Sequence, residues 1–87
     1  MNRVPNSDIP GRPIVETPGI CAGSPRIHGT RIPVWVLEGA RRLGWSNFDL
    51  LENYPTINQA DLEMAWAFVE THREKIEQEI RENNGDA

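Results

Sequence analysis

The chain has 87 residues, of which 38% are hydrophobic, and a formal net charge of −4. This length provides for one small domain that hides only about 60–65% of its unfolded surface, so oligomerisation or a bound partner is expected to add stability. Its single cysteine, Cys21, excludes an intrachain disulfide and a zinc site built from cysteines.

The charge is distributed unevenly along the chain. Residues 1–45 contain six arginines against three acidic residues, a net charge of +3, whereas residues 46–87 contain three basic residues against ten acidic ones, a net charge of −7. Such an asymmetry favours interaction chemistry over catalysis. No apolar run is long enough to span a bilayer, and residues 1–13 lack the apolar segment of a secretory signal, so a cytoplasmic location is expected.

Residues 1–13 contain three prolines and show no periodicity, which predicts a flexible arm. Two short β-like stretches follow, at 14–16 and 26–28, and they are separated by Pro18-Gly19 and Gly23-Ser24-Pro25. Because proline followed by glycine suits a type II turn, we expect a small hairpin.

The first helix is expected to begin at Pro33, which tolerates the first helical position because its missing N–H has no intrahelical partner there. Gly44 is expected to end it in a left-handed conformation, with Trp45 as the apolar residue that follows. Apolar residues recur at helical spacing between these two ends: Val36, Leu37, Ala40 and Leu43.

Ser46 is the predicted N-cap of a short second helix that ends before Pro55. Phe48 and Leu51 are expected to face inward, with Leu50 as a third candidate. A third helix, capped by Asn58, is predicted to run to about residue 82 without a break, with an apolar stripe at Leu62, Ala65, Trp66, Val69, Ile76 and Ile80.

These elements predict a mainly α fold. A short N-terminal β-hairpin precedes a three-helix bundle of the helix-turn-helix type, and the C-terminal helix is long. The expected organisation is an arm over residues 1–13, the hairpin and helices over residues 14–73, and a helical extension and tail over residues 74–87.

The segment Pro18-Gly19-Ile20-Cys21, followed by Gly23-Ser24-Pro25-Arg26-Ile27-His28-Gly29-Thr30-Arg31-Ile32-Pro33-Val34, resembles the opening of the domain-of-unknown-function 433 family. The later Tyr54-Pro55 turn and the helix over residues 60–68 are similar to the second half of that family. The resemblance covers about residues 14–72. It implies a homeodomain-like helix-turn-helix fold and genomic pairing with a PIN-like ribonuclease toxin, in the manner of VapB-type antitoxins. It carries no catalytic residues.

The residues do not favour an enzyme. The two histidines, His28 and His72, lie in different predicted elements, and the chain has no glycine-rich phosphate loop or nucleophile elbow. We therefore expect no catalytic residue, no metal and no cofactor.

DNA binding is the first of two interaction hypotheses. The second helix of a helix-turn-helix enters the major groove with its N-terminal residues, but here that helix has no lysine or arginine before Arg73, which disfavours phosphate contacts. The candidates for nucleic-acid binding are therefore basic residues of the N-terminal half: Arg26, His28, Arg31, Arg41 and Arg42. For Arg31 the alternative is a local bond to nearby carbonyls or to Glu38.

Protein binding is the second hypothesis and the preferred one. Trp35, Val36 and Leu37 are too many successive large apolar side chains for one buried helix face, so Trp35 or Trp45 is expected at a dimer or partner surface. Ile76 and Ile80 are expected to lie beyond the reach of the first two helices and, with Glu77, to dock into a partner's groove. The sequence therefore predicts an antitoxin-like, homodimeric protein that restrains a PIN-like toxin, with a DNA-binding autoregulator as the alternative.

Overall fold

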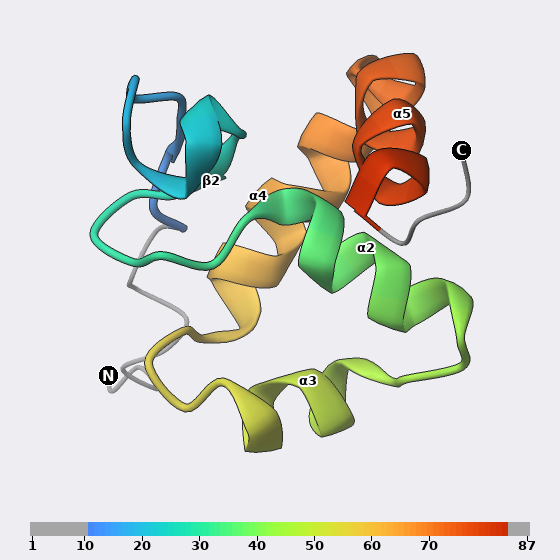
Figure 1. Ribbon diagram of the computed structural model, residues 1–87. Coiled ribbons are helices and arrows are strands. Elements are labelled where there is room, and N and C mark those ends of the chain that lie inside the picture. Colours follow the sequence, from blue (N-terminus) through green and yellow to red (C-terminus); the bar gives the residue numbers. More distant parts are fainter. Residues whose placement is uncertain (1–10, 84–87) are drawn as a thin grey trace.

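The computed structural model describes residues 11–83. A two-stranded antiparallel hairpin pairs β1 (Ile14–Val15) with β2 (Arg26–Ile27), and a short 3-10 turn, η1 (Cys21–Gly23), lies between the strands. Four helices follow: α2 (Val34–Arg42), α3 (Asn47–Asn53), α4 (Gln59–Thr71) and α5 (Arg73–Asn83). The hairpin lies at one end of the molecule, α2 runs through the middle, and α3 and α5 lie on opposite sides of α2 (Figure 1). This confirms the predicted mainly α fold with an N-terminal hairpin.

The predicted helix boundaries follow from local chemistry. Gly44 has a φ of +104°, and the N–H of Trp45 donates to the carbonyl of Ala40 at 3.2 Å, so α2 ends in a Schellman turn. Ser46 and Asp49 form a reciprocal capping box at the start of α3. Asn58 and Asp61 form a second one at the start of α4.

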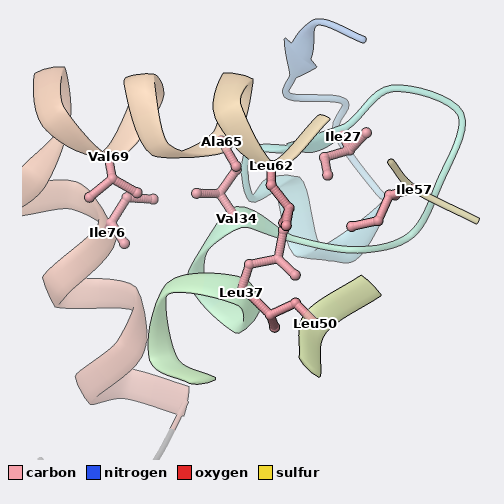
Figure 2. Close-up of a cluster of buried hydrophobic side chains, with 9 residues drawn as sticks. All are labelled: Ile27, Val34, Leu37, Leu50, Ile57, Leu62, Ala65, Val69 and Ile76. Atoms are coloured by element: carbon pink, nitrogen blue, oxygen red, sulfur yellow. The ribbon is translucent and has the colours of Figure 1, made fainter. Parts of the chain in front are cut away.

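One predicted element is wrong. The single helix expected to run to residue 82 is two helices, because His72 leaves the helical region with φ −132° and ψ 40°. The hydroxyl of Thr71 donates to the carbonyl of Phe68 at 3.2 Å, and the His72 ring stacks on Phe68 with centroids 3.8 Å apart. The bend turns α5 back so that Ile76 packs against Val69 and α5 lies along α2 (Figure 2).

The core joins all four helices and the hairpin. Val69 and Ile76 point toward each other across the bend, and Leu37 lies between α4 and Leu50 of α3 (Figure 2). Nine buried apolar side chains form this cluster: Ile27, Val34, Leu37, Leu50, Ile57, Leu62, Ala65, Val69 and Ile76. Burying apolar surface is the main favourable contribution to folding, so α5 is part of the domain rather than an extension of it. The boundary predicted at residue 74 falls inside this helix.

The predicted inward face of α3 needs correction. Leu50 is fully buried, whereas Phe48, which was expected to face inward, is 70% exposed. Leu43, at the end of α2, is predicted from the helical spacing of the first helix to be part of its apolar face, but it is 83% exposed. Both residues lie at helix ends, where small changes in helix direction decide which side chain meets the core.

Candidate functional site

The exposed face of α4 is acidic. Gln59, Glu63, Met64 and Glu70 are exposed on this helix, which contains no lysine or arginine. In the predicted helix-turn-helix arrangement, α4 would be the element that approaches a DNA major groove. Its carboxylates would repel the phosphates there, since DNA affinity depends largely on neutralising phosphate charge.

Asp61 is the centre of a buried hydrogen-bond network at the start of α4. Its carboxylate accepts bonds from the backbone N–H of Arg12 at 2.8 Å, from the Arg12 guanidinium at 2.7 Å and from the backbone N–H of Asn58 at 3.0 Å. Burial raises the pKa of Asp61, but the hydrogen bonds from Arg12 and Asn58 outweigh it and hold the pKa below its ordinary value. Arg12 also donates to the carbonyl of Thr56 at 2.6 Å.

Sequence reasoning missed this network. Arg12 was placed in a flexible arm, but it binds Asp61, 49 residues further along the chain. Gly11 lies so close to α4 that a Cβ there would overlap the Ala60 carbonyl oxygen. The predicted arm therefore ends before residue 11, and the rest of it lies outside the described residues.

A second ionic cluster surrounds Glu38, which is only 3% exposed. Its carboxylate pairs with Arg41 at 2.6 Å and with Arg42 at 2.9 Å, and Arg42 also reaches Glu77 of α5 at 3.4 Å. The Arg41 guanidinium lies 4.4 Å from the centroid of the Trp66 ring, a cation–π contact. These two arginines, predicted as nucleic-acid ligands, are thus held by contacts that join α2 to α4 and α5.

The other predicted nucleic-acid ligands divide into one buried and two exposed side chains. Arg26 is 8% exposed; its guanidinium donates to the Thr30 carbonyl at 3.0 Å and to the Thr17 hydroxyl at 3.2 Å, so it supports the hairpin. His28 and Arg31 are exposed, and neither has an ion-pair partner within residues 11–83. The alternative bond from Arg31 to Glu38 is absent from the described residues, where Glu38 pairs with α2's own arginines.

The residues predicted to dock into a partner are engaged within the domain. Ile76 is fully buried, so the premise that it extends beyond the reach of the other helices is wrong. Ile80 is half-buried and packs against the core, as does Trp35. Glu77 is half-buried and pairs with Arg42. The bend at residue 72 explains this difference, because it carries the apolar side of α5 onto α2.

The exposed large apolar side chains gather elsewhere, at the turn between α2 and α3. Leu43, Trp45 and Phe48 are 83%, 38% and 70% exposed. They line a shallow hollow of about 560 Å³ together with Gly44, Asp49, Glu52 and Asn53. We call these seven residues the turn surface. Of its apolar members, only Trp45 is a predicted candidate for exposure, and the sequence over residues 43–52 has no periodic pattern that marks the other two.

Within residues 11–83 no group of three or more histidine, cysteine, aspartate or glutamate side chains is arranged to hold a metal ion. None of the described helices is long and apolar enough to cross a membrane.

Comparison with known proteins settles the family. The family described as "Protein of unknown function (DUF433)" matches residues 14–69. This chain belongs to the DUF433 family. The crystal structure of a DUF433 member from Anabaena variabilis ATCC 29413 is 46% identical, covers 79% of this chain and 68% of its own, and superposes with a TM-score of 0.77. None of the curated proteins matches the chain. The matched DUF433 segment includes the turn surface and α4 as far as Val69, but neither Glu70 nor α5.

Proposed function

We propose that this DUF433 member is a non-catalytic, antitoxin-like protein that binds and restrains a PIN-like ribonuclease toxin. The observation that carries the proposal is the charge of α4, which contains no lysine or arginine and exposes Glu63 and Glu70, the second of which pairs with Arg73 of α5 at 3.2 Å. A ribonuclease binds a polyanion, so its RNA-binding cleft is basic, and an acidic helix complements it. The identity of the enzyme rests on the family resemblance, and the acidic face of α4 supports the proposed contact.

The contact is proposed for the acidic face of α4 rather than for Ile76 and Ile80. Ile76 holds α5 in the core, so removing α5 or replacing Ile76 would destabilise the whole domain, and a loss of binding would then have an unrelated cause. Substitutions on the exposed face of α4 leave the core intact and test the contact directly.

The test is a charge reversal with a matched control. The product of the neighbouring gene, expected to be a PIN-like ribonuclease, is purified with the full chain, and both affinity and RNA cleavage are measured. Glu63→Lys is expected to weaken the complex by about tenfold in 0.1 M salt, because it places a like charge against the basic cleft. Glu16→Lys, an equal charge change on an exposed residue of the hairpin, is expected to bind as the wild type does. An equal loss in both variants, or no complex with the wild type, contradicts the proposal.

DNA binding is the second candidate, and it rests on His28 and Arg31, which are exposed on the loop between β2 and α2. Two side chains neutralise few phosphates, since Arg26, Arg41 and Arg42 are engaged within the protein. Binding to the protein's own promoter that weakens steeply with salt and is lost in Arg31→Ala would favour this function.

A homodimer, expected because the domain is small, stays a prediction. Light scattering on the purified chain at several concentrations measures its mass directly.

A further inference from the structure

The turn surface exposes large apolar side chains to solvent. Leu43, Trp45 and Phe48 fall within six residues of sequence, and all three are exposed at the junction of α2 and α3. Single exposed apolar residues are common on monomers, but a contiguous group rimmed by polar residues marks an interaction site. Figure 1 shows that this junction projects at the end of the molecule away from the hairpin, where the described chain does not cover it.

The turn that presents these side chains is held at both ends. On the α2 side, the N–H groups of Gly44 and Trp45 donate to the carbonyls of Arg41 and Ala40 at 3.0 and 3.2 Å. On the α3 side, the Ser46 hydroxyl accepts from the N–H of Asp49 at 3.1 Å, and the Asp49 carboxylate accepts from the N–H of Ser46 at 2.9 Å. A surface ordered before binding loses little conformational entropy on association.

The rim of the turn surface is acidic. Asp49 and Glu52 are exposed beside the hollow, and none of its seven lining residues is basic. The hydrogen bonds from Ser46 hold the pKa of Asp49 below its ordinary value, so this carboxylate remains charged at neutral pH. An occupant must therefore offer apolar side chains with cations next to them.

A second copy of this chain does not meet that requirement. In a two-fold symmetric contact the same patch meets itself, so the Asp49 and Glu52 carboxylates of both copies would approach one another without a cation between them. Like charges placed opposite each other without a cation between them weaken association.

We infer that the turn surface is a docking site for a basic, amphipathic helical segment of a partner protein, with apolar side chains against Leu43, Trp45 and Phe48 and lysine or arginine side chains against Asp49 and Glu52. The inference deepens the proposed function and rests on it for the identity of the natural partner. It adds a second contact, built on apolar burial, to the charge contact on α4.

The direct test uses a defined probe and the full chain. A designed helical peptide of about 15 residues, with leucines at every third or fourth position and lysines between them, is titrated into isotope-labelled protein and followed by NMR. Amide shifts are expected to be concentrated over residues 43–53. The same peptide with glutamate in place of lysine is expected to produce at least tenfold weaker binding. Shifts centred elsewhere, or equal binding of both peptides, overturn the inference.

Substitutions in the turn surface then test which side chains bind the peptide. Leu43→Ser combined with Phe48→Ser alters two exposed residues, so the protein is expected to stay folded and to bind the lysine peptide at least tenfold more weakly. Gln78→Ser, a change at an exposed residue of α5 outside both the turn surface and the acidic face of α4, is the control and is expected to bind as the wild type does. Concentration-dependent shifts at the turn surface without peptide would identify a second copy as the occupant and refute the inference.

Measuring ribonuclease binding as well as peptide binding distinguishes the proposed function from the proposed docking site. Where the wild type binds the enzyme and the Leu43→Ser and Phe48→Ser double variant binds it equally well, the docking site is refuted and the proposed function stands. Where the enzyme does not bind but the lysine peptide docks on residues 43–53 as expected, the proposed function fails and the docking site stands.

Discussion

Replacing Asp61 with alanine isolates the contribution of the buried network at the start of α4. Asp61 is fully buried, and its carboxylate accepts hydrogen bonds from the Arg12 backbone, the Arg12 guanidinium and the Asn58 backbone. Removing one partner of a buried ion pair typically costs 3–5 kcal/mol of stability. The Arg12 side chain is 35% exposed and regains water once released, so we expect a loss near the lower end, about 3 kcal/mol.

Asp49 provides a matched control for this measurement. It occupies the same position in the capping box of α3 but is exposed and has no arginine partner within residues 11–83. Asp49→Ala removes the same local motif without breaking a buried pair, so its loss of stability should be much smaller.

Urea denaturation followed by tryptophan fluorescence compares the two variants. A domain of this size has a stability of about 5–10 kcal/mol, so Asp61→Ala should remain folded in water. With a denaturant slope of about 1.5 kcal/mol/M, its midpoint should fall by about 2 M. If Asp61→Ala costs no more than Asp49→Ala, the network from Arg12 adds nothing to the local cap, and the assignment of the N-terminal anchor is refuted.

Three further outcomes follow from the same contacts. Because the folded-state pKa of Asp61 lies below its ordinary value of 3.8, its contribution is present above that value and is lost as the pH falls through the folded pKa; the wild type should therefore lose more stability than Asp61→Asn between pH 5 and 2 in thermal unfolding. Ile76→Ala should cost about 3 kcal/mol in urea unfolding and Ile80→Ala clearly less, since only Ile76 is fully buried; equal costs would contradict the packing of α5 on α2. Gly44→Ala should cost about 1–2 kcal/mol, because φ is +104° and no atom within 4 Å hinders a Cβ; an unchanged midpoint would contradict the strain.

Local chemistry allowed most of the elements to be predicted. Capping at Ser46 and Asn58, the stop at Gly44 and the break before Pro55 depend on neighbours a few residues away, so the sequence displays them directly. Leu62, Val69 and Ile76 of the predicted apolar stripe are all fully buried, although they lie on two helices rather than on one.

The tertiary structure decided where that stripe goes. Residues 71 and 72 contain neither glycine nor proline, so the bend between α4 and α5 has no strong local signal; burying Ile76 against α2 favours it over an exposed straight helix. Because this bend buries Ile76, the candidate docking site is the turn surface rather than Ile76 and Ile80.

Ion pairs between distant segments likewise could not be predicted from the sequence. Spacing within one helix predicts which charges are neighbours along it, as for Glu38 with Arg41 and Arg42, but not whether they are buried. No spacing predicts Arg12 with Asp61 or Arg42 with Glu77, since their side chains meet only after the helices pack. The sequence by itself therefore determined most of the helix ends and the total charge, but not the division between α4 and α5. The packing of α5 and of the N-terminal segment determined which arginines are engaged within the protein and which apolar residues remain exposed.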